Sequence, residues 1–316
     1  MTNSKPKLIV ITGPTASGKS SLAIELAVRL GGEIVNADSM QVYRGMDVGT
    51  AKPPIGVRRG IPHHLIDTVD PDETFNAAIY RNLALPAIQD IRKRKRVCFV
   101  VGGTGLYIKT LLGGLLKCPP ADPVLREDLR RQCEEYGTLF LHKRLEKLDP
   151  GSARRIHPHD KIRIMRALEI IELTKTPLSV LTQKHGFKEK PFQTLKICLQ
   201  MSREHLYDRI NKRCLLMIDH GLVKETENLL SKGYAPELKP MKSLGYRHMI
   251  RYLEGRWGLD EAIHQLQTDT RRYAKRQLTW FRADPQMAWF EAEEKESIVC
   301  KIEEFMVSGE NTEEGS

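Results

Sequence analysis

Short apolar runs alternate with segments of helical periodicity along the N-terminal part of the chain. The run KLIVITG, residues 7–13, is almost wholly apolar and ends in glycine, which is typical of a buried parallel strand. The next segment, SSLAIELAVRLGG, places leucine at helical spacing at Leu22, Leu26 and Leu30 before two glycines. The pattern therefore predicts a strand, a loop and a helix, in that order.

The same alternation continues further along the chain. The segment EIVNADS predicts a second strand that ends at Asp38, and apolar runs at residues 63–67 and 96–103 predict others. Residues 73–95 have a helical pattern, with a bend expected near Pro86. Strands that alternate with helices form a parallel sheet with helices on both faces. The predicted fold class is therefore α/β.

The character of the chain changes at Pro119, Pro120 and Pro123. From there to about Lys190 the sequence is charged, helical in period and poor in strand signals, which predicts a small all-helical insertion domain. The run TLKICLQM then predicts a returning core strand, with helices after it. The expected organisation is a first part of the core, the helical insertion, the completed core and a disordered tail, at residues 1–120, 121–190, 191–306 and 307–316.

Length and composition narrow the class of protein. The chain has 316 residues, enough for two domains or for one large core with an insertion. Its apolar share of 41% is that of a soluble globular protein, and no run approaches the ~20 apolar residues that cross a bilayer. The N-terminus lacks the pattern of a secretory signal. We therefore expect a cytoplasmic protein that has no membrane partner.

Cysteine spacing and net charge add two further expectations. The six cysteines form no CxxC pair and have no nearby histidine at zinc-finger spacing, so neither a disulfide framework nor a metal cluster is favoured. The formal net charge of +10 favours a polyanionic partner such as nucleic acid. Basic chains of this size are common, so charge alone does not identify the partner.

The segment GPTASGKS satisfies the pattern G-x-x-x-x-G-K-[ST] of a phosphate-binding loop, between a predicted strand and a predicted helix. In such a loop the backbone N–H groups turn inward, the lysine supplies a cation and the serine hydroxyl can bind Mg²⁺. Nucleotides and plain diphosphates satisfy the same amides, so the loop does not fix the ligand. We predict phosphate binding by the whole loop, with Ser20 as metal ligand: Gly13, Pro14, Thr15, Ala16, Ser17, Gly18, Lys19 and Ser20.

Asp38 is expected at the carboxyl end of the second strand, where neighbouring parallel strands converge on one crevice that faces the phosphate loop. A carboxylate there can take a proton from a nucleophile or hold a metal ion through water; a turn or helix cap is the alternative. The run VVGGTGLY places Thr104 near the same crevice. Its strand ends in Gly102, not in the aspartate that orients the metal in nucleoside triphosphatases. Either Asp38 takes that role or the chemistry is not triphosphate hydrolysis.

Six segments, in their order and spacing, resemble the bacterial tRNA dimethylallyltransferases, and the resemblance runs from about Lys7 to Arg282: GPTASGKS, NADSMQVYRGMDVGTAKP, VVGGTGLY, HPHDKIRIMRALEI, SLGYRHM and RRYAKRQLTWFR. The resemblance implies a P-loop core and transfer of a dimethylallyl group from its diphosphate to N6 of adenosine 37, beside the anticodon. It further implies Mg²⁺ as cofactor and release of pyrophosphate. The implied partners are dimethylallyl diphosphate and the tRNA anticodon stem-loop, for which a monomer suffices.

The resemblance also implies roles for residues of the crevice. Asp38 would be the base that takes a proton from N6, and Thr104 would position the adenine or the attacking centre. Asp38 and the three residues after it, Ser39, Met40 and Gln41, would read the flipped base and its neighbours.

Basic residues indicate where pyrophosphate and RNA would bind. Arg209 and Arg213, four apart in a predicted helix, are candidates for reaching the pyrophosphate. A solvated helix face is the alternative for the basic residues of the insertion, and a core position is the alternative for Tyr246. The predicted RNA contacts, besides the crevice residues, are Arg126, Lys161, Arg163 and Arg166 in the insertion, and Lys242, Gly245, Tyr246, Arg247, Arg272 and Arg276 near the C-terminus.

Three other functions remain open at this stage. A small-molecule P-loop kinase would bind ATP at the same loop, and an RNA-binding protein could retain the loop as a vestigial nucleotide site. An adenylate isopentenyltransferase would prenylate a free nucleotide. The helical insertion and its basic residues favour an RNA acceptor over a free nucleotide.

Overall fold

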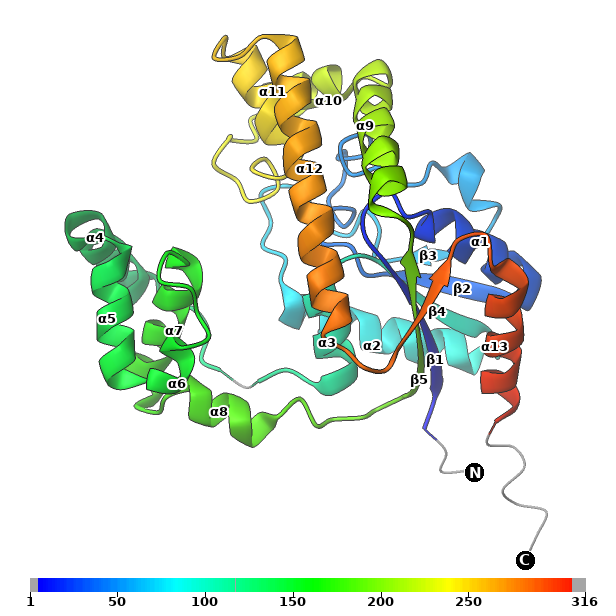
Figure 1. The fold of residues 1–316 in the computed structure, drawn as a ribbon, viewed down its shortest axis with the longest axis horizontal. Helices are drawn as coiled ribbons and strands as arrows, with labels where there is room; N and C mark the ends of the chain where they lie inside the picture. Colours follow the sequence, from blue (N-terminus) through cyan, green and yellow to red (C-terminus); the bar gives the residue numbers. More distant parts are fainter. Residues whose placement is uncertain (1–4, 117, 309–316) are drawn as a thin grey trace, which may run out of the picture. The chain divides into compact units, whose positions relative to one another are not determined.

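A computed structural model describes residues 5–116 and 118–308 of the chain (Figure 1). These residues divide into two compact units. The first, the core unit, consists of the segments up to Leu112 and from Pro191 onward. The second, the insertion unit, is Gly113–Lys190.

The core unit contains a six-stranded sheet in which every pairing is parallel. The strand that precedes the phosphate loop, β1, lies between β4 and β5, so the loop emerges near the middle of the sheet. The predicted α/β fold class is confirmed. In spatial order the strands are β3 (His63–His64), β2 (Gly32–Asn36), β4 (Val97–Val101), β1 (Lys7–Thr12), β5 (Gln193–Gln200) and β6 (Met287–Glu291).

Two strands differ from the sequence prediction. The chain after residue 201 was expected to be helical, but Met287–Glu291 forms β6, which pairs in parallel with β5. The prediction was wrong because an edge strand of four half-buried residues and one exposed residue lacks both a long apolar run and a clear alternation. The strand expected at residues 63–67 is reduced to the two residues of β3.

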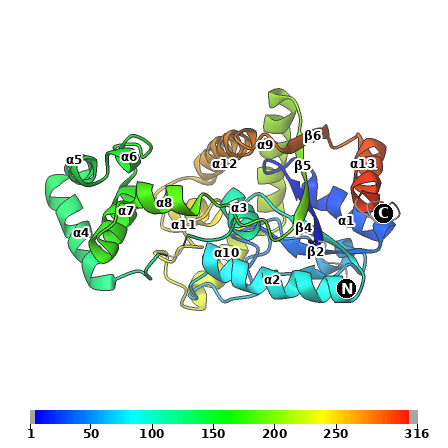
Figure 2. The ribbon, with the colours of Figure 1, turned by 90° about the horizontal axis from the view of Figure 1, so that it is seen from below.

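The two faces of the sheet bury different helices because side chains alternate along each strand. Ile9 and Ile11 of β1 pack with α1 (Lys19–Leu30) and α13 (Lys295–Val307). Leu8 and Val10 face the opposite way, in the cluster that includes α2 (Ala77–Lys93) and α3 (Gly105–Gly113). Figures 1 and 2 show α1 and α13 together on one side of the strands. The predicted helical cover on both faces is therefore present.

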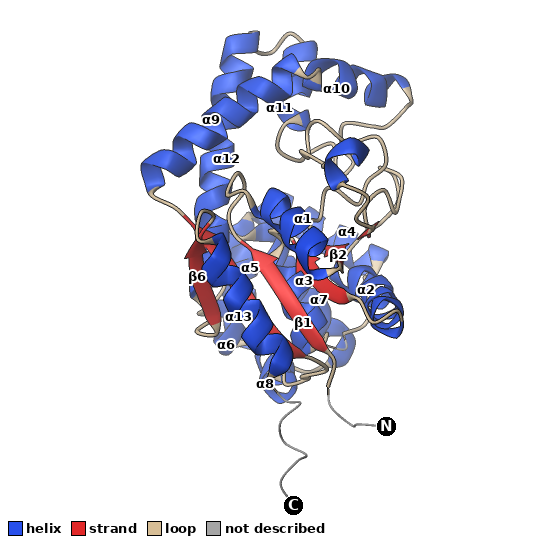
Figure 3. Cartoon of the chain, turned by 90° about the vertical axis from the view of Figure 1, so that its right-hand side faces the viewer, coloured by secondary structure: helices blue, strands red, loops and turns tan. Residues whose placement is uncertain are grey.

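A group of four helices rises from the carboxyl ends of the strands (Figure 3). The first of them begins directly after β5, where the Ser202 hydroxyl caps the backbone N–H of His205. The longest of them packs against two of the others. These helices are α9 (Arg203–Asp219), α10 (Leu222–Ser231), α11 (Tyr246–Leu253) and α12 (Leu259–Arg282).

Helices are the only regular secondary structure among the described residues of the insertion unit, as the sequence predicts. Aspartate side chains cap three of its helices: Asp122, Asp149 and Asp160 each accept a backbone N–H at the helix start. The unit has its own apolar core, which includes Leu129, Leu145 and other residues of four helices. Its helices are α4 (Pro123–Tyr136), α5 (Thr138–Leu148), α6 (Pro150–Ala153), α7 (Lys161–Thr174) and α8 (Leu178–His185).

Candidate membrane spans, clusters of metal-binding side chains and disulfides are absent from the described residues. None of the helices is both long and apolar enough to span a bilayer. Within residues 5–116 and 118–308, no group of three or more His, Cys, Asp or Glu side chains is arranged to hold a metal ion. All six cysteines are free thiols, and Cys300 is exposed.

Candidate active site

The phosphate loop connects β1 to α1 through residues with positive φ. Gly18 has φ +92° and starts the helix, and a Cβ atom at Gly13 would lie 3.0 Å from the Leu199 carbonyl oxygen. Within the loop, Ser17 N–H donates to the Pro14 carbonyl at 3.2 Å. The backbone N–H groups of Ala16, Gly18, Lys19 and Ser20 donate to no described residue. The loop therefore retains free donors at a helix N-terminus, as anion binding requires.

Two cations, Lys19 and Arg213, line a cavity beside this loop. Neither forms a salt bridge with a described residue. Burial, and next the nearby Arg213, lower the pKa of the Lys19 ammonium to about 8. Burial also lowers the pKa of the Arg213 guanidinium, whose Nη1 donates to the Thr15 hydroxyl at 3.1 Å. Like charges held together and partly desolvated favour an anion between them. Arg209 also lies at the loop: its Nη2 is 3.4 Å from the position of a Cβ on Gly18.

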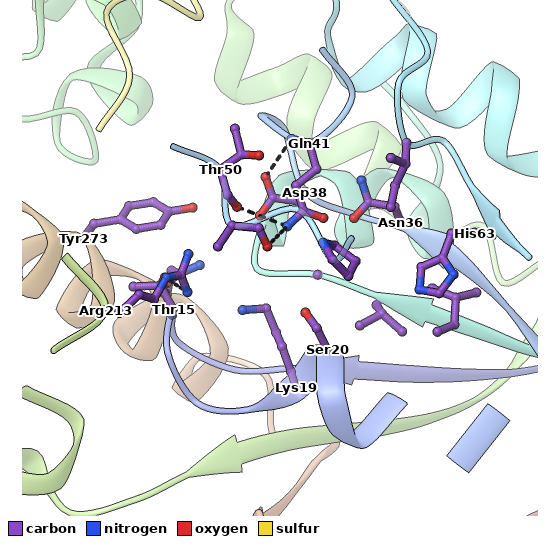
Figure 4. Close-up of a pocket in the computed structure, with 17 residues that line it drawn as sticks. Thr15, Lys19, Ser20, Asn36, Asp38, Gln41, Thr50, His63, Arg213 and Tyr273 are labelled. Carbon is purple, nitrogen blue, oxygen red and sulfur yellow. Dashed lines mark hydrogen bonds between the residues drawn. The ribbon is translucent and has the colours of Figure 1, made fainter. Parts of the chain in front are cut away.

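Asp38 follows β2 and faces these cations across the cavity (Figure 4). Its Oδ1 accepts the backbone N–H groups of Met40 at 2.8 Å and Gln41 at 3.4 Å. Its Oδ2 accepts no hydrogen bond from a described residue. The turn-cap alternative is thus correct for one oxygen, while the second oxygen remains available to a ligand or a proton.

Thr104 supports the segment that carries Asp38. Its Oγ1 accepts the backbone N–H of Ser39 at 3.0 Å, and its own N–H donates to the Ala37 carbonyl at 3.1 Å. A Cβ at Gly102 would lie 2.2 Å from that same carbonyl oxygen, so only glycine permits this approach. The structure thus brings the predicted pair, Asp38 and Thr104, together through the backbone of Ser39.

Two adjoining cavities meet at Asp38. The smaller, about 60 Å³, extends from Lys19 and Ser20 of the phosphate loop. The larger, about 280 Å³, is lined by apolar side chains of α9 and α12, by Met40 and by polar groups that include Ser39. The residues common to both cavities are Thr15, Asp38, Thr50, Arg213 and Tyr273. A ligand on the phosphate loop and a second ligand in the larger cavity would therefore meet beside the Asp38 carboxylate.

The loop after Asp38 is anchored by a carboxylate from α10. Glu225 accepts three consecutive backbone N–H groups, those of Asp47, Val48 and Gly49, at 2.8 to 3.0 Å. Gln41, the last of the predicted base-reading residues, donates through Nε2 to the Thr50 and Ala51 carbonyls. Hydrogen bonds from the Gln41 side chain therefore help to hold this loop in its conformation.

The predicted RNA contact of Tyr246 is wrong, and the alternative, a core position, is correct. Its ring is fully buried, its hydroxyl donates to Glu225 at 2.6 Å, and a Cβ at Gly49 would lie 2.5 Å from its ring. The Tyr246 ring packs against the backbone at Gly49 and its hydroxyl is bonded to the Glu225 carboxylate, so this aromatic residue of a glycine turn belongs to the core. Gly245 beside it has φ +90° and is also buried, whereas Lys242 is exposed.

The predicted RNA-contact arginines of the core unit gather around α12. Arg247 and Arg276 line the larger cavity. Arg247 Nη2 and Arg272 Nη1 donate to the two oxygens of Asp269, at 2.5 Å and 3.2 Å. The Arg276 guanidinium lies 5.8 Å from the centre of the Tyr273 ring. These residues remain predicted RNA contacts.

In the insertion unit, the predicted RNA contacts are paired with acids. Arg126 and Arg166 both donate to Glu169, whose side chain is fully buried. Arg163 and Lys161 lie near carboxylates at 3.4 Å and 3.8 Å, and Arg163 remains largely exposed. Glu169 was not predicted from the sequence, because nothing in the pattern around it distinguishes a buried glutamate from a solvated one.

Gln277 of α12 is a residue of the site that was also not predicted from the sequence. Its Oε1 accepts the Thr15 N–H at 2.8 Å, so this loop amide is not free for a ligand, contrary to the prediction that it binds the diphosphate. Its Nε2 donates to the Gly103 carbonyl at 2.9 Å. The helical pattern of residues 271–282 places Gln277 beside the aromatic residues, but no sequence signal links it to a loop more than 250 residues away.

The cavity also fits a bound Mg²⁺. The Ser20 hydroxyl lines the smaller cavity and has no hydrogen-bond partner among the described residues. Mg²⁺ prefers oxygen ligands, retains several waters and is usually held by one or two protein groups together with substrate phosphates. Ser20 and the free oxygen of Asp38 are donors of that kind.

The parallel sheet, the glycine-rich loop and its unpaired cations define a phosphate-loop α/β protein whose anion site adjoins a second cavity. Comparison with known proteins assigns it more closely. The model of the IPP transferase family matches residues 41–284, and an isopentenyl transferase model matches residues 6–57. The chain belongs to the IPP transferase family.

Individual relatives agree with this assignment over nearly the whole chain. The tRNA dimethylallyltransferase of Desulfosudis oleivorans is 49% identical, covering 96% of this chain and 98% of the relative. The tRNA dimethylallyltransferase of Geobacter sulfurreducens is 51% identical, covering 91% of this chain and 93% of the relative.

Two solved structures are also similar. The tRNA isopentenylpyrophosphate transferase of Bacillus halodurans is 42% identical, with a TM-score of 0.70 over 95% of this chain and 98% of that one. A eukaryotic dimethylallyltransferase acting on tRNA is 29% identical, with a TM-score of 0.82 over 95% of this chain and 79% of that one. The family resemblance seen in the six sequence segments is confirmed.

Proposed function

We propose that this enzyme transfers a dimethylallyl group from dimethylallyl diphosphate to N6 of adenosine 37 in the anticodon stem-loop of tRNA, in the cytoplasm, and releases pyrophosphate. The observation that carries the proposal is the position of Asp38, where a cavity with two unpaired cations meets a larger one. The relatives' names support transfer of this group to tRNA.

The diphosphate would bind at the phosphate loop. Negative charge develops on the bridging oxygen as the allylic C–O bond breaks, and an exocyclic adenine amine is too weak a nucleophile to displace a poor leaving group. Lys19, Arg213 and the free loop amides are donors fixed beside that position. A preorganised donor of this kind lowers the barrier by ~3 to 4 kcal/mol. Mg²⁺ held at Ser20 would neutralise further charge on the pyrophosphate.

The acceptor adenine would enter the larger cavity. A base must leave its stack to reach such a site, which costs least in a single-stranded loop. The new bond joins N6 to the allylic carbon, and the amine then loses one proton. Oδ2 of Asp38 is free to accept that proton, while Oδ1 is held by the Met40 and Gln41 amides. Thr104 fixes Ser39 and thereby the orientation of this carboxylate.

A single assay tests the proposal. The full-length protein is incubated with Mg²⁺ and dimethylallyl diphosphate labelled in the prenyl group, with unmodified tRNA, AMP or no acceptor. We expect label in tRNA only, located at adenosine 37 after nuclease digestion. Label in AMP would instead identify an adenylate isopentenyltransferase, and ATP-dependent phosphorylation of a small molecule would identify a kinase. Binding of tRNA without any transfer would also contradict the proposal.

A further inference from the structure

Gln277 connects three parts of the site through one chain of hydrogen bonds. Its primary amide accepts the Thr15 N–H of the phosphate loop and donates to the Gly103 carbonyl, in the turn after β4. The Thr15 hydroxyl in turn accepts a hydrogen bond from Arg213 at 3.1 Å. The side chain of Gln277 therefore ties one turn to the phosphate loop and, through Thr15, to one of the two cations of the cavity.

The packing around this amide is close. Gln277 is 6% exposed, and a Cβ atom at Gly103 would lie 2.1 Å from its Nε2. One turn further along α12, Nε1 of Trp280 would lie 2.1 Å from a Cβ at Gly105. At two glycines of the segment VVGGTGLY, α12 thus approaches the backbone more closely than a Cβ atom would allow without movement of a side chain. The contact is made between backbone and a fixed side chain, which gives it little freedom to shift.

Gln277 also lines the smaller cavity, but both ends of its amide already have partners within the fold. The loop amides and the two cations are the donors beside it that lack such partners. The hydrogen bonds of Gln277 therefore link its effect on a ligand to Thr15 and Arg213. Without the amide, the Thr15 N–H would lose its partner and the Arg213 guanidinium would lose the fixed hydroxyl that orients it.

We propose that Gln277 is a positioning residue, which holds Thr15 and Arg213 in the geometry that binds the diphosphate. This inference rests on the proposed function, in which the phosphate loop binds that group. It assigns the RQ pair of the segment RRYAKRQLTWFR two different tasks, because Arg276 lines the acceptor cavity whereas Gln277 supports the diphosphate loop.

The first test compares Gln277→Leu with the wild-type protein. Pyrophosphate binding is measured by calorimetry in Mg²⁺, and the KM values for dimethylallyl diphosphate and for tRNA are measured separately. We expect about tenfold weaker pyrophosphate binding and an increase in the donor KM of about the same size, because a buried donor is left unpaired and Arg213 must be ordered on binding. The KM for tRNA should stay unchanged.

Gln267→Leu is the matched control. This second glutamine of α12 donates to the Asn211 carbonyl at 3.5 Å and lines neither cavity. Its loss removes a hydrogen bond between α12 and α9 without touching the phosphate loop. We expect its pyrophosphate affinity to equal that of the wild-type protein.

Gln277→Glu gives a readout that a merely structural role would not change. The carboxylate can still accept the Thr15 N–H, but it cannot donate to the Gly103 carbonyl and it adds negative charge beside an anion site. Protonation restores the missing donor. The ratio of its donor KM to that of the wild-type protein should therefore fall as the pH is lowered from about 7 to about 4, through the ordinary pKa of glutamate.

The outcomes separate the two proposals. If the wild-type protein binds no pyrophosphate, the proposed function fails and the role of Gln277 fails with it. If the wild-type protein binds pyrophosphate and Gln277→Leu binds it as tightly as Gln267→Leu does, only the positioning role is wrong. If Gln277→Leu does not fold, Gln277→Glu decides, and a constant KM ratio across this pH range would overturn the inference.

Discussion

Lys19 and Arg213 at the phosphate loop form no salt bridge with a described residue, whereas Arg126 and Arg166 of the insertion unit share the buried carboxylate of Glu169. In the insertion unit, burial of the glutamate is compensated by two guanidinium groups and by the Asp122 N–H. At the phosphate loop no carboxylate forms a salt bridge with the two cations, and burial, followed by the nearby Arg213, lowers the pKa of Lys19 although Asp38 faces it across the cavity.

This difference distinguishes cations that build the fold from cations that bind a ligand. Removal of one partner from a buried ion pair destabilises the folded chain, so a paired arginine serves the fold without any other molecule. Charges of one sign that are partly desolvated together destabilise the empty protein, so their arrangement is explained by an anion that arrives from outside. Sequence composition counts both kinds equally, which is why the net charge of +10 predicts a polyanionic partner but not where it binds.

The largest expected effect concerns Asp38, the carboxylate that faces the unpaired cations. Asp38→Asn retains an oxygen that can accept the Met40 and Gln41 amides, but it removes the proton acceptor. We expect kcat to fall between about a hundredfold and ten-thousandfold, with tRNA affinity unchanged. Near-normal kcat in a steady-state transfer assay would show that Asp38 is not the base.

The next effect tests the unpaired cations directly. Lys19→Met should lower the transfer rate by about a hundredfold to a thousandfold, because a charged donor to the leaving group is lost. Lys212→Met is the matched control, since that lysine is exposed on α9 and pairs with Asp208. Single-turnover rates with labelled donor measure both. Equal rates in the two variants would mean that Lys19 is no different from a surface cation.

The paired cations should instead affect stability. Glu169→Gln leaves two guanidinium groups without their carboxylate, and we expect a loss of about 1 to 3 kcal/mol in the free energy of unfolding. Urea unfolding followed by circular dichroism measures it, and Glu127→Gln, at an exposed pair on α4, should change it by less than about 0.5 kcal/mol. Equal losses of unfolding free energy in the two variants would show that burial of the Glu169 ion pairs adds nothing to stability.

Arg126 tests most directly the difference between cations that build the fold and cations that bind a ligand. It is paired with Glu169 and is also a predicted RNA contact. If it also binds a phosphate, Arg126→Ala should reduce the slope of log Kd for tRNA against log salt by about one. If it only builds the fold, stability falls and the slope does not change. Arg130→Ala on the same helix, at the exposed Glu127 pair, provides the reference slope.

The smallest effect is a pH dependence at Lys19. Its pKa is about 8 in the empty protein, and a bound anion should raise it, so binding of pyrophosphate takes up a proton where the free lysine is partly neutral. We expect an uptake of up to about half a proton at pH 8 and almost none near pH 6. Calorimetry in buffers of different ionisation enthalpy measures this, with Lys19→Arg as reference, because arginine stays charged.

The same pKa determines how the free energy of unfolding changes with pH. Below pH 8 the ammonium is charged in both the folded and the unfolded chain, and its burial costs free energy of folding. Between pH 8 and the ordinary value of 10.5, the unfolded chain binds more protons at Lys19 than the folded one. The contribution of Lys19 to the free energy of unfolding therefore rises with pH across that window.

The sequence by itself determined the elements whose signals are local. The apolar run before GPTASGKS and the leucine spacing after it predicted β1 and α1, because a buried strand and an amphipathic helix are written in neighbouring residues. Parallel topology then placed Asp38 and Thr104 near the loop, since the carboxyl ends of parallel strands meet at one edge. The family also followed from sequence, through the order of its segments.

Only the tertiary structure decided which polar groups are already paired. Tyr246 was indistinguishable in sequence from a ring that stacks on a base, until the packing around Gly49 buried it against Glu225. Gln277 reaches a loop 262 residues away in the chain, and Glu169 gathers its partners from separate helices. Local sequence governs backbone conformation and amphipathicity, whereas desolvation and hydrogen-bond satisfaction depend on neighbours that only the folded chain brings together.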